Sequence, residues 1–191
     1  MSAMVRRAGR AMLADGTQVV WSVADGRRGR RWRALTTRDE ALTGVLLLEV
    51  GVDGRPVRLE LATAAGLLTL HPDATGSLHG NAVTRDGVRH LAFTWSFEHE
   101  LEIDGLPIAS AVTARRLAGS TAMGEGRTVP VVAVAPDLSV REEGRRYVRT
   151  GEATWRIEGE GDARTLTIDE RGLPVWSGEA GEWPLELESH G

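Results

Sequence analysis

Residues 42–62, LTGVLLLEVGVDGRPVRLELA, place two strand-like segments on either side of an Asp-Gly pair at positions 53 and 54. In the second segment, apolar residues at positions 57, 59 and 61 alternate with Arg58 and Glu60. This is the period-two pattern of a strand with one buried face. Asp-Gly favours a tight hairpin turn because both residues tolerate a positive φ angle. The stretch therefore predicts a β-hairpin.

The same pattern recurs along most of the chain. Further Asp-Gly pairs begin at positions 15, 25, 86 and 104. Strands are predicted over residues 18–24, 30–36, 42–50, 55–62, 67–71, 77–84, 88–103, 128–135, 145–158, 164–169 and 173–177. Turns at such regular spacing are typical of an antiparallel meander. We therefore predict an all-β fold with little helix, in which the meander closes into a β-roll or barrel around an apolar cavity.

Helical signals are weak by comparison. Residues 6–14 have the length of two helical turns, and residues 108–117 are predicted to form a helical or irregular crossover. A βαβ architecture is not expected because no amphipathic helical segment recurs between the strands. At this length one domain is expected. We predict an N-terminal extension over residues 1–16 and a single β-roll domain over 17–191.

Composition excludes several chemistries. The chain has 191 residues, no cysteine, and arginine at all 23 basic positions. Without cysteine there is no disulfide, thiolate nucleophile or zinc ribbon, and without lysine there is no Schiff-base enzyme or Walker-type phosphate loop. We expect no cofactor. A net charge of −4 disfavours nucleic acid as a partner.

Hydropathy indicates a cytoplasmic protein. The longest apolar stretches, residues 45–48 and 129–135, are far shorter than the ~20 residues of a transmembrane helix. No continuous apolar segment follows the arginines near the N-terminus, so a signal peptide is not expected. We therefore predict no membrane span and a cytoplasmic location.

The clearest predicted strand is residues 88–103. Its apolar residues fall on one face, and Glu98 and Glu100 fall on the other. The apolar face holds Leu91, Phe93, Trp95, Phe97, Leu101 and Ile103. His99 also lies on this face and places a titratable imidazole among aromatic side chains. His99 is predicted to be either a core or rim residue, or a ligand contact or general acid–base.

A second aromatic group lies in the C-terminal half. Tyr147 and Arg149 share one face of a predicted strand and could present a hydroxyl and a guanidinium group to a ligand, or else serve structural roles. Trp155 lies on an inward face together with Ile157. Large aromatic side chains can fill a core or line a cavity.

Two polar motifs are weaker candidates. Residues 26–33, GRRGRRWR, surround Trp32 with five arginines. They are interpreted as a solvated edge strand whose charges prevent edge-to-edge pairing, with the binding of an anionic group as the alternative. His71, Asp73 and His79 are metal-ligating residue types, but their spacing matches no metal signature. We expect no metal site.

Several segments, read in order, resemble the glycolipid-binding family of bacterial proteins, whose β-roll is similar to lipoprotein carriers. The segments are Trp21 with Gly29, 42–44, 53–59, 76–80, 86–91, 103–107, 115–117, 136–140, 147–151 and 168–173. The resemblance covers Trp21 to Trp183. Family members carry an acidic segment and a Pro-x-Thr-Asn element before the position of residues 115–117. Here residues 108–114 read IASAVTA, which implies a changed ligand or another task.

The resemblance implies binding of an apolar, lipid-like or polyketide-like small molecule. The predicted cavity is lined by Phe93, Trp95, Phe97, Tyr147 and Trp155, and Arg116, Arg149 or His99 would hold an anionic head group near its mouth. The alternative is a cofactor-independent cyclase or isomerase that works by positioning a polyketide-like or polyene substrate, with His99 and Tyr147 as the catalytic candidates. A structural or protein-interaction module is expected if the interior is solid.

Overall fold

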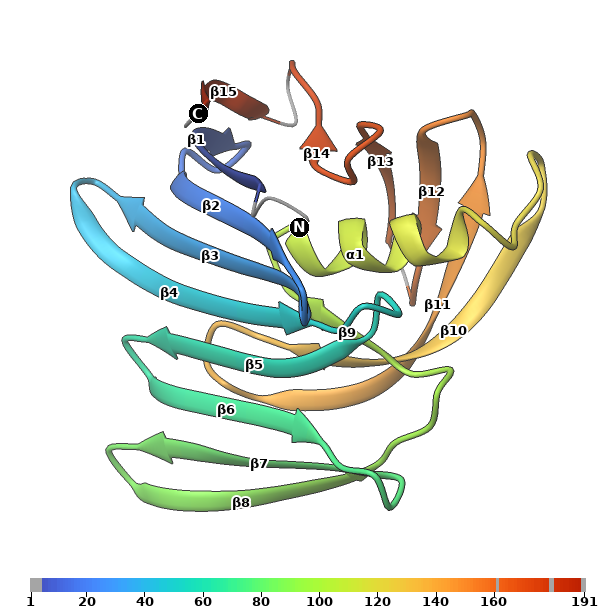
Figure 1. The fold of residues 1–191 in the computed structure, drawn as a ribbon. Helices are drawn as coiled ribbons and strands as arrows, with labels where there is room; N and C mark the ends of the chain where they lie inside the picture. Colours follow the sequence, from blue (N-terminus) through green and yellow to red (C-terminus); the bar gives the residue numbers. More distant parts are fainter. Residues whose placement is uncertain (1–4, 161, 179–180, 190–191) are drawn as a thin grey trace. The chain divides into compact units, whose positions relative to one another are not determined.

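The computed structural model describes residues 5–160, 162–178 and 181–189 (Figure 1). Strands dominate the described residues, which confirms the predicted all-β fold. The chain divides into two compact units. The first comprises Met1–Ser96, Pro136–Leu138 and Trp176–Gly191, and the second comprises Phe97–Ala135 and Ser139–Val175. The sequence predicts one domain over residues 17–191, so the division into two units is a property that only the structure supplies.

The first unit contains a nine-stranded antiparallel sheet. Its strands are β1 (Val5–Leu13), β2 (Gln18–Gly26), β3 (Gly29–Arg38), β4 (Ala41–Val50), β5 (Pro56–Thr63), β6 (Gly66–Pro72), β7 (Ser77–Thr84), β8 (Gly87–Thr94) and β15 (Gly181–Ser189). They lie in the order β15-β1-β2-β3-β4-β5-β6-β7-β8. The predicted meander is thus found in β1–β8, and β15 and β8 form the two edges of the sheet.

One face of this sheet is buried and the other is open, because apolar and polar residues alternate along the strands. The buried face includes a tryptophan cluster at one end. Trp21 stacks on Trp183 with ring centroids 5.8 Å apart, and Trp32 and Trp176 lie 6.1 and 5.6 Å from Trp21 and Trp183, respectively. Trp21, Trp32 and Trp183 are buried and form part of the core of the first unit, whereas Trp176 is half-buried.

The second unit contains a six-stranded sheet and the α-helix found among the described residues. Its elements are β9 (Glu100–Ile103), α1 (Ile108–Leu117), β10 (Gly126–Val134), β11 (Val140–Arg149), β12 (Thr154–Glu158), β13 (Ala163–Ile168) and β14 (Pro174–Val175). The order is β14-β13-β12-β11-β10-β9. β9 and β10 are parallel, so the chain needs a crossover between them. α1 provides it at the predicted position, and this single βαβ connection is an exception to the antiparallel pattern.

Residues 6–14 have the length of two helical turns, but they are not helical. They form most of β1, which pairs with β2 on one side and with β15 on the other. Pairing with residues almost at the other end of the chain outweighs a weak local helical preference. The segment is therefore an internal strand of the sheet, not an extension outside it.

The predicted continuous strand over residues 88–103 is also wrong. β8 ends at Thr94 and β9 begins at Glu100, and the two strands belong to different sheets. A similar break divides the predicted strand 145–158 into the hairpin of β11 and β12. The alternation of apolar and polar residues can continue in phase across a turn, so the sequence pattern does not reveal either break. Among the described residues, no helix is long and apolar enough to cross a membrane.

Candidate functional site

The arginine-rich segment lies in β3, which is an interior strand. It pairs with β2 through residues 29–37 and with β4 through residues 30–38. The predicted edge-strand role is therefore wrong, and protection against edge-to-edge pairing does not account for these charges. Trp32 points to the buried face, whereas Arg31 and Arg33 point to the open face.

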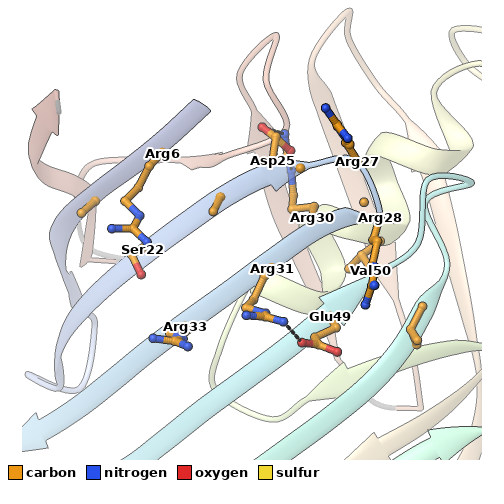
Figure 2. A pocket seen from close by; sticks show the side chains of 15 residues that line it. Arg6, Ser22, Asp25, Arg27, Arg28, Arg30, Arg31, Arg33, Glu49 and Val50 are labelled. Carbon is orange, nitrogen blue, oxygen red and sulfur yellow. Dashed lines mark hydrogen bonds and ion pairs between the residues drawn. The ribbon is translucent and has the colours of Figure 1, made fainter. Parts of the chain in front are cut away.

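A partly open groove of about 710 Å³ lies beside the β2–β3 turn, at the end of the sheet where β3 begins. Figure 2 shows arginine side chains around it, from β1, from β3 and from the turn between β2 and β3. The lining arginines are Arg6, Arg27, Arg28, Arg30, Arg31 and Arg33. The lining carboxylates are Asp25 and Glu49, and Ala8, Ala24, Val50 and Val57 add apolar surface. The groove therefore combines an excess of positive charge with an apolar component.

The β2–β3 turn that carries Arg27 and Arg28 depends on Gly29. Gly26 and Gly29 form the last pair of the hairpin. Gly29 has φ +118°, and a Cβ atom there would lie 2.0 Å from the carbonyl oxygen of Val50. Only glycine fits this combination of a positive φ and a close backbone approach. The two arginines are thereby held at the mouth of the groove.

Only some of the groove's positive charge is neutralised. Asp25 accepts hydrogen bonds from Arg30 Nε at 2.6 Å and Arg30 Nη2 at 3.0 Å. Glu49 pairs with Arg31 at 2.5 Å, as the dashed line in Figure 2 marks. The structure pairs Arg6, Arg27, Arg28 and Arg33 with no carboxylate in the described part of the chain. Four guanidinium groups are therefore available to an external anion.

A second polar cluster lies within the second unit and is buried. Glu100 and Glu102 of β9 point toward α1 and are 0% and 2% exposed. Thr113 Oγ1 donates to Glu100 at 3.1 Å, and Arg116 forms an ion pair with the same carboxylate. We refer to this cluster, with the groups around Glu102, as the buried network.

Glu102 has hydrogen-bond partners on three other elements. It accepts hydrogen bonds from Ser110 Oγ at 2.8 Å and from Arg164 Nη2 at 2.9 Å. Arg164 also donates to Ser110 Oγ at 2.9 Å. Tyr147 of β11 donates its hydroxyl proton to Glu102. The buried network thus joins β9, α1, β11 and β13.

Burial raises the pKa of Tyr147 well above 10, and the neighbouring charge of Glu102 raises it further. Its hydroxyl is therefore a hydrogen-bond donor at neutral pH. Ser110 and Thr113 are buried and hydrogen-bonded. Buried charged groups with partners of this kind hold elements together in one arrangement. The geometry fits a structural role for the network better than chemistry on a diffusing substrate.

Three of the residues predicted to bind ligand do meet in the second unit. Tyr147 packs edge-on against Trp155 with ring centroids 6.5 Å apart, and the Arg149 guanidinium lies 5.9 Å from the centre of the Trp155 ring. Arg149 also donates to the carbonyl groups of Ala118, Thr121 and Glu152. Tyr147 and Trp155 are fully buried. Arg116 also belongs to the second unit, where it forms an ion pair with Glu100.

The other predicted site residues lie elsewhere. Phe93 and Trp95 belong to the first unit and are half-buried. Phe97 and His99 belong to the second unit, in the segment between β8 and β9. Phe97 is 68% exposed and His99 is half-buried. The eight predicted residues are therefore divided between the two units, with two in the first and six in the second.

Sequence reasoning missed the role of the β9 carboxylates. Glu100 is predicted to be on a wet face because it alternates with apolar residues, but all four residues of β9 are buried. A sequence signal was present in α1, where Ser110, Thr113 and Arg116 recur at a spacing of three residues and mark a polar stripe on a mostly buried helix.

His71, Asp73 and His79 lie on or beside the β6–β7 hairpin. His79 Nε2 lies 2.9 Å from Asp73 Oδ2, and the rings of His71 and His79 are 6.3 Å apart. A backbone hydrogen bond from Ser77, with help from Thr75, lowers the pKa of Asp73 to about 2. Over the ranges that the structure describes, no three metal-ligating side chains come together.

No protein-family model matches the sequence, and no curated protein matches it. The fold is similar to the crystal structure of a DUF1089 family protein from Pseudomonas aeruginosa. The alignment has a TM-score of 0.57 and 20% sequence identity, and it covers 94% of this chain and 91% of that chain. This likeness supports the all-β fold along nearly the whole chain.

Proposed function

We propose that the first unit binds a lipid-like amphiphile whose anionic head group lies in the arginine-lined groove. The observation that carries this proposal is the surplus of arginine there: six line the groove beside two carboxylates, in a chain whose net charge is −4. Guanidinium groups bind phosphate and carboxylate through charge-assisted, often bidentate hydrogen bonds. The groove's volume is in the range of small-molecule sites.

The lining favours an amphiphile over a nucleic acid. Sites for single-stranded nucleic acid combine positive charge with aromatic side chains on which bases stack. The fifteen residues that line the groove include no aromatic residue. Apolar contact comes instead from small aliphatic side chains such as Ala24 and Val57, which suit an alkyl chain near the head group.

Isothermal titration calorimetry with dodecyl phosphate, below its micelle concentration, tests this function. Dodecylphosphocholine provides the same chain with a neutral head group. We expect tight binding of the phosphate only, and at least about tenfold weaker binding after Arg28→Glu, because a charge-assisted hydrogen bond is replaced by repulsion. Arg127→Glu changes an exposed arginine of the second unit and is the matched control.

Two results would contradict the proposal. One is equal affinity for the phosphate and the phosphocholine amphiphile, which would remove the requirement for an anionic head group. The other is unchanged binding by the Arg28→Glu variant with folding intact by circular dichroism, which would place the ligand away from the groove.

A further inference from the structure

An apolar row crosses the open face of the first unit's sheet. The strand register places its members directly opposite one another on β2 to β8. The row consists of Val20, Leu35, Val45, Ala62, Leu67, Val83 and Val88. Figure 1 shows these strands side by side in the sheet. The row crosses six strand spacings and is therefore about 29 Å long.

The side chains of the apolar row are unusually accessible. Apart from Ala62, each is between 38% and 59% exposed. Single exposed apolar residues are common on protein surfaces, but a contiguous series marks an interaction site. The row therefore needs an apolar partner surface of similar length.

The two margins of the row carry opposite charge. On one side, Arg33 lies two residues from Leu35 along β3, and Arg6 lies farther along the same face. Both lack an ion-pair partner in the part of the chain that the structure describes. On this side the acids Glu49 and Glu60 are paired with Arg31 and Arg58. This margin is therefore basic.

The other margin is formed by alternate turns of the meander, which lie at the same end of the sheet. These turns carry four acidic residues, Asp15, Asp39, Glu40 and Asp86. Their basic residue is Arg85, which is exposed. Asp15 is paired with Arg38. Asp39, Glu40 and Asp86 form no ion pair with any described residue. This margin is therefore acidic.

We propose that the apolar row is a self-association surface at which two copies of this chain pack face to face. A two-fold axis parallel to the row places row on row and lays the basic margin of each chain over the acidic margin of the other. Arg33 of one chain then lies opposite Thr37 of the second chain, and the Asp39–Glu40 turn begins two residues farther along, within the reach of an arginine side chain. A two-fold axis perpendicular to the row would place arginine opposite arginine, which costs free energy at an interface.

A second copy accounts for both margins, whereas an anionic lipid surface would match the arginines and be repelled by the acidic turns. Arg27 and Arg28 of the β2–β3 turn lie farther from the row than the acidic turns do, so they extend beyond the overlap. Arg33 lines the groove and also lies in the proposed interface. Self-association does not require that the groove hold a ligand.

Sedimentation velocity of the full chain over a range of concentrations tests the association. We expect a reversible monomer–dimer equilibrium in which Leu67→Asp raises the dissociation constant by at least about tenfold, because it places a charge in the apolar contact. Met123→Asp makes a similar change at a residue that is 67% exposed in the second unit, and it should have no effect. A wild-type chain that stays monomeric at every concentration overturns the proposal.

Engineered cysteines test the orientation, because the chain has no cysteine of its own. With the axis parallel to the row, each row residue meets its own counterpart, so Val88→Cys alone should form a disulfide-linked dimer on mild oxidation. Met123→Cys should not. Crosslinking that occurs only when Val20→Cys and Val88→Cys chains are mixed would overturn the parallel axis.

A charge exchange completes the test and does not depend on the apolar residues. Arg33→Glu should weaken the dimer, and adding Glu40→Arg to the same chain should restore it, because both margins are then reversed. Failure of the double variant to recover overturns the proposed pairing of margins. Sedimentation is measured without ligand, so these results are independent of binding in the groove.

Discussion

For Tyr147, the local sequence pattern correctly predicts burial of the side chain but does not predict which group it contacts. Its alternation with neighbouring polar residues indicates an inward-facing side chain, and the side chain is buried. Its partner, Glu102, comes from a strand 45 positions earlier in the chain. No local pattern contains that contact. A hydroxyl predicted to meet a ligand therefore lies in a network that holds β9, β11 and α1 together.

The chain offers an unusually clean test of this residue. Tyr147 is its single tyrosine, and lysine and cysteine are absent, so tyrosinate absorbance during an alkaline titration reports on Tyr147 alone. Because burial raises the pKa of Tyr147 well above 10, the folded protein should ionise only well above pH 10, and the urea-unfolded chain near 10. Ionisation near pH 10 in the folded state would show that the side chain is not buried.

The same shift has a consequence for stability. A pKa that is higher in the folded than in the unfolded state stabilises the fold fully below pH 10, and this contribution is lost as the pH rises toward the folded-state pKa. Tyr147→Phe should lose this alkaline dependence. It should also lower the free energy of unfolding at pH 7 by about 1–3 kcal/mol, because a buried oxygen of Glu102 loses a donor. Urea unfolding of both proteins across this pH range measures the two effects.

At the scale of elements, turn residues correctly predicted where hairpins form, whereas an unbroken alternation of side chains did not correctly predict where strands end. The hairpin around Asp53-Gly54 and the crossover at residues 108–117 are found where the sequence predicts them. β8 and β9 are predicted as one strand, because the side chains of residues 95–99 continue the alternation. What ends β8 is the departure of the chain to a different sheet, which depends on distant residues. β9 is buried throughout because α1 packs on it.

The β2–β3 hairpin provides a prediction about a single element. Gly29→Ala should destabilise the protein more than Gly87→Ala. Both glycines have a positive φ, which costs an alanine about 1–2 kcal/mol. A Cβ atom at Gly29 would also meet the Val50 carbonyl at 2.0 Å, whereas a Cβ atom at Gly87 would meet nothing within 4 Å. Urea unfolding of the two variants measures the difference, and equal losses would contradict the close approach at Gly29.

At the scale of the whole molecule, the distribution of charge matters more than its sum. The chain has a net charge of −4, yet four groove arginines are without a described carboxylate partner. The net charge alone therefore gives no sign of a surface where positive charge is concentrated, whereas the groove is such a surface. The contrast arises because β3 is an interior strand, so that Arg6 of β1 and the arginines of the β2–β3 turn lie on the same surface as the arginines of β3.

Salt provides the corresponding prediction. Binding of dodecyl phosphate should weaken as sodium chloride is raised, because the groove is partly open and exposed charges more than about 8 Å apart are screened at physiological ionic strength. Calorimetry at several salt concentrations measures the slope. Arg28→Glu should reduce the slope, whereas Arg127→Glu should leave it as in the wild type. Affinity that rises with salt would indicate a predominantly apolar mode of binding.

The sequence by itself determined the all-β class, most of the hairpins, the position of the crossover helix and the exclusion of thiol and lysine chemistry. These properties depend on side-chain period, turn residues and composition, which are local. The tertiary structure alone decided that the chain forms two units, that β3 is interior, that Glu100 and Glu102 are buried, and that arginines of three segments surround one groove. Each of these depends on pairing between distant strands, and the free energy of that pairing resides in contacts that no short window of sequence contains.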